Sequence, residues 1–360
     1  MSAILLLEDG TSFEGISLGA SGQRIGEVIL HTAVVGYQEM MTDPANSGKI
    51  LVFTYPLIGN YGIAEQFNES RRCWIEGLII KEQSRIHSNW QAEDSFPHLL
   101  EKQGIVAIGE IDTRTLAVKI RDEGQTWGIL SAEEGPKGEL LRRLKDQKGM
   151  VKNDFISQIS VDRIFEFKGD GSGPRVAILD LGITHGFLEQ LKRLGCHMLL
   201  LPYNTDAEEI LGWNPEGLLL SNGPEEDEAI PQIVETIRRL LGQIPLWGIS
   251  TGHQIICLAL GGSRRKMKLG HHGANYPVIS PSSLKGDITF QNHSWAVDEE
   301  SLAGKGDIAI SLRNLNDQSI EEIESRSLRI LSTQYYPISP GFDEVNPAFM
   351  RFLAMMKESI

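Results

Sequence analysis

The sequence has few of the features that mark membrane, secreted or nucleic-acid-binding proteins. No stretch of its 360 residues is long and apolar enough to cross a bilayer, and no basic segment precedes the short N-terminal apolar run. Its three cysteines have no zinc-ligand spacing, which favours a reducing compartment without structural disulfides. A net charge of -14 disfavours nucleic acid and anionic lipid as partners. We expect a cytoplasmic protein whose one short basic run, 264–268, forms a solvated face or contacts an acidic partner subunit.

The apolar pattern changes between the two halves of the chain. From residue 4 to about 132, short apolar runs alternate with turn signals, which is typical of strands. Helices are expected at 94–104, at 113–124, where Thr113 can cap and Gly124 can end the helix, and over 133–150. We predict a first domain at 1–150, a linker at 151–173 and a second domain at 174–360.

The second half has the pattern of an open, doubly wound α/β domain. Its strands are expected to be continuous apolar runs, as strands covered on both faces of a parallel sheet require. Helical stretches fall between them, and the loops at the carboxyl ends of such strands are where sites form. The apolar runs lie at 176–182, 197–204, 217–223 and 245–250.

Residues 245–262 have the layout of a nucleophile elbow. An apolar strand is followed by a five-residue turn with a glycine at each end, Gly248 and Gly252, and then by an apolar helix. The glycines permit a sharp turn, so residue 250 is expected to project at its tip in a strained conformation beside a helix N-terminus. The residue there is Ser250. Because this layout is common in α/β proteins, it leaves the role of Ser250 open.

The turn Gly-Ile-Ser-Thr-Gly-His-Gln at 248–254 resembles the Gly-Ile-Cys-Leu-Gly-His-Gln motif of class I glutamine amidotransferases. Further segments resemble the small subunits of carbamoyl-phosphate synthetases, among them LEDGTSFEG, GEVILHTAVVGYQEMMTDP and IVAIGEIDTRTL in the first half and LLLSNGP, MKLGHHGANYPV and QNHSWAVDE in the second. The resemblance extends over essentially the whole chain. It implies an α/β fold in which a strand-rich small-subunit domain precedes a flavodoxin-like, doubly wound amidotransferase domain.

At the positions of the family's catalytic triad the chain differs from the family. Ser250 replaces the cysteine nucleophile, and a serine hydroxyl needs a well-placed base in order to react. Tyr336 falls where the family has its histidine, and the glutamate is either replaced by Ile338 or deleted, because the segment is one residue short. A phenol with a solution pKa near 10 is a poor general base. We therefore predict an inactive triad.

The resemblance also identifies the positions around the family's substrate. The family's Asn-Gly-Pro-Gly loop, whose backbone amides stabilise the oxyanion, here ends in Glu225, which disfavours both the loop geometry and the anion. Ser294 and Trp295 are larger than the residues of the family. Unchanged positions are Ser47, Gln254 and Asn292. The full predicted set is Ser47, Gly223, Glu225, Thr251, Gln254, Asn292, Ser294 and Trp295.

The resemblance implies a function in a two-subunit enzyme. The family's small subunit hydrolyses glutamine and passes ammonia to a large subunit, which makes carbamoyl phosphate for arginine and pyrimidine synthesis. It implies a large-subunit partner that binds ATP, magnesium and bicarbonate, and no cofactor in this chain. Because the triad is altered, we expect glutamine to bind weakly or not at all and its hydrolysis to be lost. The chain would then be a structural or regulatory partner of an ammonia-using large subunit.

A serine hydrolase is an alternative of a different class. Gly-x-Ser-x-Gly at 248–252 fits the pattern of such enzymes, with Asp287, Asp298 or Asp307 as the acidic partner. That fold requires an aspartate and then a histidine after the serine. No histidine follows His293, so Asp287 alone precedes a histidine.

Two further expectations concern ligands. The unchanged pocket positions could hold an amino-acid head group, which would make the chain a metabolite-binding regulatory module. No metal site is expected, because the histidines at 253, 271 and 272 have no acidic or sulfur partner at ligand spacing. These histidines are expected to make structural hydrogen bonds.

Overall fold

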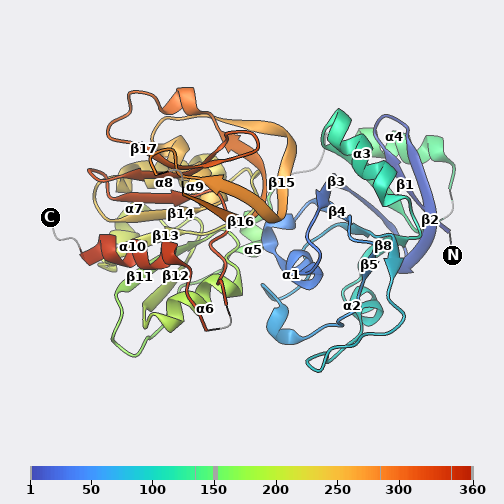
Figure 1. The fold of residues 1–360 in the computed structure, drawn as a ribbon, viewed down its shortest axis with the longest axis horizontal. Coiled ribbons are helices and arrows are strands. Elements are labelled where there is room, and N and C mark those ends of the chain that lie inside the picture. Colours follow the sequence, from blue (N-terminus) through green and yellow to red (C-terminus); the bar gives the residue numbers. More distant parts are fainter. Residues whose placement is uncertain (1, 134, 149–152, 284, 342, 358–360) are drawn as a thin grey trace. The chain divides into compact units, whose positions relative to one another are not determined.

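The computed structural model describes residues 2–133, 135–148, 153–283, 285–341 and 343–357 (Figure 1). The chain divides into two compact units, residues 1–153 with 268–272 and residues 154–267 with 273–360. The predicted α/β fold class is confirmed, because a strand-rich N-terminal unit precedes a doubly wound C-terminal unit. No helix among the described residues is long and apolar enough to span a membrane.

The N-terminal unit is built around a closed barrel. Its strands follow one another around the barrel in the order β1 (Ser2–Leu7), β2 (Ser12–Gly19), β8 (Val106–Gly109), β6 (Gly77–Ile79), β4 (Lys49–Phe53), β3 (Gln23–His31) and β9 (Thr126–Ser131). Two short strands, β5 (Leu57–Ile58) and β7 (Glu82–Gln83), form a separate pair. Apart from this pair, the named strands of the first half form one sheet that closes on itself.

Alternating side chains fill this barrel. Val28 and Leu30 of β3 pair in register with Ile50 and Val52 of β4, and all four belong to one buried cluster. Residues two apart on a strand lie on the same face, so each strand contributes every second side chain to the interior. Leu6 belongs to a different buried cluster, which includes Leu140 and Leu144 of the helix at Lys137–Lys148.

Three helices of the N-terminal unit lie close to where the sequence predicts them: α2 (Phe96–Lys102), α3 (Thr113–Glu123) and α4 (Lys137–Lys148). The sequence analysis did not predict α1 (Tyr37–Thr42) or the one-turn 3-10 helices η1 (Pro44–Asn46) and η2 (Glu65–Phe67). Asp112, rather than Thr113, caps α3, because its carboxylate accepts from the backbone N–H of Thr115 at 3.0 Å. Gly124, with φ 106°, ends α3 as predicted. Residues 134, 149 and 150 of the helix predicted over 133–150 lie outside the described residues.

The C-terminal unit contains a ten-stranded sheet. Its five parallel strands pair in the order β12 (His197–Pro202), β11 (Arg175–Asp180), β13 (Gly217–Leu220), β14 (Leu246–Ile249) and β19 (Ile330–Thr333). The order second, first, third, fourth, fifth is that of flavodoxin-like sheets. The remaining strands are β18 (Ile320–Ser325), β17 (Ala309–Asn314), β15 (Arg264–Ile279) and β16 (Gly286–Val297) beyond β19, and β10 (Phe165–Phe167) beside β12.

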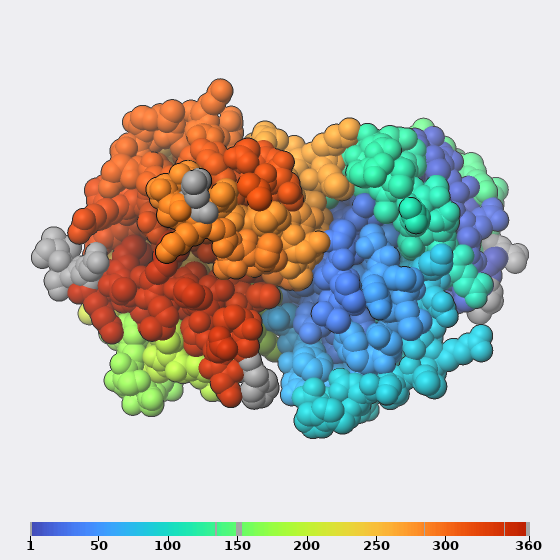
Figure 2. Space-filling view, viewed as in Figure 1, coloured from blue at the N-terminus to red at the C-terminus, as the bar shows by residue number. Residues whose placement is uncertain are grey.

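Helices cover both faces of the parallel strands. One buried cluster joins alternate strand residues to α7 (Ala207–Gly212), α8 (Ile230–Leu240) and α9 (Thr251–Ala259), and the opposite cluster joins the other residues to α6 (His185–Arg193) and α10 (Pro347–Lys357). Burial on both faces explains why the strands are continuous apolar runs. In Figure 2, α10 is seen in red at the surface of this unit. The 3-10 helix η3 (Glu299–Leu302) follows β16.

Two segments group differently from the predicted domain bounds. Residues 154–173, predicted as linker, belong to the C-terminal unit and contain α5 (Ile156–Ile159) and β10. The Asp227 carboxylate accepts from the backbone N–H groups of Phe155 and Ile156 at 2.7 and 2.9 Å, which ties α5 to this unit. Residues 268–272 group with the N-terminal unit, where Leu269 packs against the barrel core. Residues 149–152 lie outside the described residues.

Candidate functional site

The turn between β14 and α9 has the geometry of a nucleophile elbow. Ser250 has φ 54° and ψ -107°, a conformation that side-chain-bearing residues rarely adopt. A Cβ at Gly248 would collide with the backbone of Gly252, and one at Gly252 would collide with the backbone carbonyl of Leu220. Both glycines are therefore required for the helix to lie this close to the sheet, and this packing holds Ser250 at the tip.

The hydroxyl of Ser250 is buried without a hydrogen-bond partner among the described residues. The side chain has no exposed surface, and its backbone N–H donates to the carbonyl of Thr333 at 2.8 Å. A serine becomes nucleophilic when a neighbouring base accepts its proton. No described group is placed to accept the proton of the Ser250 hydroxyl.

His253, the histidine nearest in sequence to Ser250, makes its contacts elsewhere. Its Nδ1 lies 2.6 Å from the hydroxyl oxygen of Ser332, and its Nε2 lies 4.0 Å from the sulfur of Cys257. Complete burial lowers its pKa from 6.5 to about 3. His253 is therefore a neutral structural residue that joins α9 to β19.

The other two triad positions also lack acid–base chemistry. Tyr336 is buried among aromatic rings, with ring centroids 5.6 Å from Phe187 and 5.7 Å from Phe290. The side-chain amide of Asn222 donates to its hydroxyl at 3.3 Å. Ile338 is 46% exposed and offers no titratable group. Tyr336 fills apolar space in this part of the fold, and nothing at 338 could orient a base.

The loop after β13 brings a carboxylate into the interior. Gly223 has no room for a side chain, because a Cβ would collide with the backbone of Leu181, and its carbonyl accepts from the Thr251 hydroxyl at 2.6 Å. Glu225 is 4% exposed. Its carboxylate accepts from the side-chain amide of Gln254 at 2.7 Å and from the backbone N–H groups of Ser294 and Trp295 at 2.7 and 3.1 Å.

The structure brings three of the predicted pocket residues, Gln254, Ser294 and Trp295, together around this carboxylate. Gln254 comes from α9, and Ser294 and Trp295 come from β16, as does the buried Asn292. Ser47 belongs to the N-terminal unit, where its hydroxyl donates to the carbonyl of Pro44 at 2.9 Å. The glutamine-binding role of all these positions stays a prediction.

Arg264 and Glu226 complete the group, and sequence reasoning missed both. The guanidinium of Arg264 lies 4.7 Å from the ring centroid of Trp295 and donates to the side-chain oxygen of Gln254. Burial lowers the pKa of Arg264, while the carboxylates of Glu225 and Glu226 act in the opposite direction. Arg264 is half-buried, whereas Arg265, Lys266 and Lys268 of the same basic run are exposed. No local sequence signal could have found them, because Glu226, Arg264 and Trp295 lie far apart in the chain.

The acidic residues considered for a serine hydrolase have other partners. Asp287 is exposed and accepts from the backbone N–H of Ile288 at 2.8 Å. The carboxylate of Asp298 accepts from Ser263 at 3.3 Å. Hydrogen bonds from two serine hydroxyls and a backbone N–H lower the pKa of Asp307. None of these contacts joins an acid to a histidine and Ser250, as a hydrolase triad requires.

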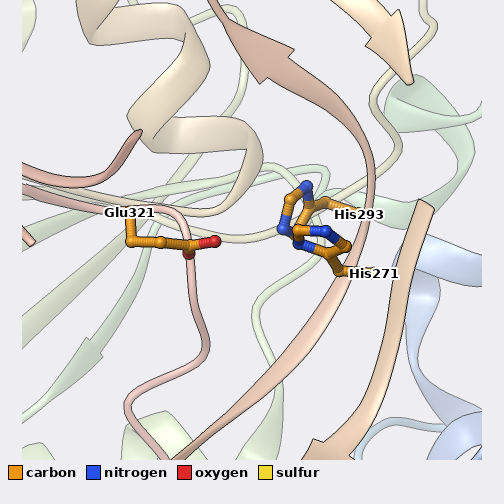
Figure 3. Close-up of side chains that lie close together, drawn as sticks. All are labelled: His271, His293 and Glu321. Atoms are coloured by element: carbon orange, nitrogen blue, oxygen red, sulfur yellow. The ribbon is translucent and has the colours of Figure 1, made fainter. Parts of the chain in front are cut away.

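Figure 3 draws His271, His293 and Glu321, side chains of the types that bind metals. His271 belongs to the N-terminal unit and the other two to the C-terminal unit, so these three do not form a site within either unit. Nδ1 of His293 lies 2.9 Å from the carbonyl of Trp295, and Nε2 lies 2.9 Å from the side-chain oxygen of Gln291. With both ring nitrogens engaged, His293 has a structural role, and the expectation of no metal site stays a prediction.

Comparison with known proteins identifies the class and then the family. Residues 177–352, which include the elbow, match the family described as "Glutamine amidotransferase class-I". Residues 5–130 match "Carbamoyl-phosphate synthase small chain, CPSase domain". The chain belongs to the carbamoyl-phosphate synthase small-chain family.

Similarity to individual relatives extends over the whole chain. The carbamoyl phosphate synthase small chain of Listeria innocua is 40% identical over 98% of this chain and 96% of its own length. The chloroplastic small chain of Oryza sativa is 39% identical over 99% of this chain and 82% of its own. The pyrimidine-specific carbamoyl phosphate synthase small chain of Halalkalibacterium halodurans is 39% identical over 100% of this chain and 98% of its own length.

Removing the Ser250 hydroxyl should stabilise the protein. We expect Ser250→Ala to raise the free energy of unfolding by about 1 kcal/mol, because a buried hydroxyl without a partner is lost. Ser221→Ala is the matched control. The Ser221 hydroxyl accepts from Leu181 and donates to the Asn222 carbonyl, both at 2.9 Å, so its loss should cost about 1 to 2 kcal/mol. Urea unfolding measures both, and equal destabilisation would contradict the assignment of an unpartnered hydroxyl.

Burial of neutral His253 should make the protein sensitive to acid. Its folded pKa, about 3, lies below the solution value of 6.5, so below pH 6.5 the unfolded chain binds a proton that the native state does not. Stability therefore falls as the pH decreases from 6.5 towards 3, by about 2 kcal/mol at pH 5 from this residue. In His253→Asn, the stability loss measured between pH 7 and pH 5 should be smaller by this amount. Exposed His87, changed to Gln, is the control, and an unchanged loss in His253→Asn would contradict the effect.

Proposed function

We propose that this chain is the small subunit of a carbamoyl-phosphate synthase and that it does not hydrolyse glutamine. Its partner is a large subunit that makes carbamoyl phosphate from free ammonia. The observation that best supports the proposal is the buried hydroxyl of Ser250, which has no hydrogen-bond partner among the described residues. An amidotransferase must activate its nucleophile, and the groups at 336 and 338 are a buried phenol and an exposed isoleucine side chain.

The folded state of the N-terminal unit supports a retained role in assembly. The resemblance assigns to this unit much of the contact with the large subunit. Hydrogen bonds hold the side chains of its Gly-Tyr-Gln-Glu motif at 36–39 in place. The hydroxyl of Tyr37 donates to the Gly62 carbonyl at 2.5 Å, and the side-chain amide of Gln38 donates to the Ala64 carbonyl at 2.7 Å. A chain that keeps an intact docking unit but has an altered triad fits a subunit whose function is to bind its partner.

The remaining parts of the proposal follow from the same role. ATP, magnesium and bicarbonate belong to the large subunit, and this chain binds glutamine weakly or not at all. The product serves arginine or pyrimidine synthesis, for which the similarity to a small chain named as pyrimidine-specific is a precedent. Three free, buried cysteines favour the cytoplasm as its compartment.

Glutamine hydrolysis is the direct test. The purified chain, alone and with its cognate large subunit, should release no more glutamate from glutamine than Ser250→Ala does. The complex should make carbamoyl phosphate from ammonium but not from glutamine. These rates are measured by coupled assays of glutamate and of carbamoyl phosphate, with an unaltered-triad relative as the positive control.

Comparison of the natural chain with Ser250→Ala separates the outcomes of this test. Glutamate release by the natural chain that disappears in Ser250→Ala would identify Ser250 as a working nucleophile and overturn the proposal. Synthesis from glutamine by the natural complex would do the same. The expected result is that the natural complex and the Ser250→Ala complex make carbamoyl phosphate from ammonium at equal rates.

A segment of the N-terminal unit that exposes two large apolar side chains is the surface that we expect the large subunit to cover. Between β7 and α2, Ile86 is 78% and Trp90 is 90% exposed. Figure 2 shows this segment, in cyan, at the surface of the N-terminal unit. Large apolar side chains this exposed mark interaction sites, and tryptophan is a frequent energetic centre of interfaces.

Truncating this tryptophan should weaken the complex. We expect Trp90→Ala to raise the Kd for the large subunit by about tenfold or more, as measured by calorimetry on the purified subunits. Trp213→Ala is the matched control, because Trp213 is a partly exposed tryptophan of the C-terminal unit. An unchanged Kd for Trp90→Ala, or an equal loss in both variants, would count against this surface.

A further inference from the structure

Glu225 is placed like a bound ligand. Its carboxylate is buried and receives three N–H donors: one from the side chain of Gln254 on α9 and two from the backbone of β16 at Ser294 and Trp295. The donors come from two elements distant in sequence from the loop that contains Glu225. They converge on the two oxygens of one carboxylate, as in a built anion site.

The surroundings offset the cost of burying this charge. A buried carboxylate is costly unless it is paired and fully hydrogen-bonded. The guanidinium of Arg264 supplies the opposite charge, and it is held in place by the ring of Trp295 and the side-chain oxygen of Gln254. Neighbouring Glu226 accepts from the indole N–H of Trp295 at 3.0 Å, which orients that ring. The side chain of Glu225 therefore lies among oriented N–H donors and close to an opposite charge.

These donors coincide with the predicted amino-acid pocket. Gln254, Ser294 and Trp295 are positions that the family resemblance places around the substrate, and 225 is the position where the family has glycine. We propose that Glu225 is a built-in ligand whose carboxylate occupies the carboxylate subsite of this pocket and so excludes free amino acids. The inference rests on the proposed function in taking the pocket to be an inherited amino-acid pocket.

The intramolecular position of Glu225 gives it an advantage over any free carboxylate. A group attached to the same chain competes at a high effective concentration and needs no further ordering when it is already held by packing. A free amino acid must displace it and leave its charge without donors. The native chain should therefore bind free amino acids much more weakly than a form without this side chain.

Removing the side chain tests the inference. Isothermal titration calorimetry with L-glutamate, L-glutamine and acetate is carried out on the natural chain, Glu225→Gly and Glu225→Ala. We expect at least one of the three probes to bind the truncated forms with a Kd lower by about tenfold or more than that of the natural chain. The same probe should raise the melting temperature of the truncated forms and leave that of the natural chain unchanged.

Two further variants provide controls. Glu228→Gly changes an exposed residue of the same loop to glycine and should bind the probes no better than the natural chain. Glu225→Gln keeps the bulk and one oxygen acceptor, so the pocket should stay occupied. Should Glu225→Gly not fold, Glu225→Ala decides by the same criterion, since glutamate truncation is common to both.

The outcomes separate this inference from the proposed function. Folded truncated forms that bind all three probes no better than the natural chain would overturn the built-in ligand, as would a natural chain that binds them equally tightly. Neither result depends on catalysis. Unchanged probe binding by the truncated forms, with no glutamate release by the natural chain, would overturn the built-in ligand alone. Glutamate release by the natural chain would overturn the proposed loss of hydrolysis and, because hydrolysis requires bound glutamine, the exclusion of free amino acids as well.

Discussion

The close approach of α9 to β13 and β14 is the constraint on which the C-terminal unit depends. It exists because neither Gly248 nor Gly252 has a side chain, and it brings Ile255 and Ile256 of α9 into the buried cluster over the sheet. The same approach forces Ser250 into its positive φ. The elbow conformation is thus imposed by packing, so it persists when the residue at its tip has no base.

Exclusion of water from the elbow determines which groups can stay there. A charge in this interior needs donors or an opposite charge. His253 avoids this requirement because it stays neutral. The Glu225 carboxylate satisfies it through three N–H donors near the Arg264 guanidinium. Tyr336 also has no charge to satisfy there, and its ring packs against other aromatic rings. Each side chain is thus suited to a dry interior and not to proton transfer.

The parts of this structure that could be predicted from sequence depend on local patterns. Continuous apolar runs predicted four of the five parallel strands but not β19, and two glycines four residues apart predicted a turn with residue 250 at its tip. The cap of α3 was harder, because two capping residues are adjacent and the preceding one, Asp112, reaches the free N–H. The grouping of 268–272 with the barrel depends on contacts that no local pattern encodes.

The environment of Glu225 shows why the site itself was less predictable. Its donors lie at 254, 294 and 295, so its burial depends on how three distant segments meet. From sequence alone, a glutamate in a loop is expected to disfavour a developing anion, which is a statement about catalysis. In the structure, this carboxylate satisfies N–H donors that would otherwise need another acceptor. Under the proposed loss of hydrolysis, nothing requires the pocket to stay open for a substrate, and a side chain that satisfies these donors favours the folded state.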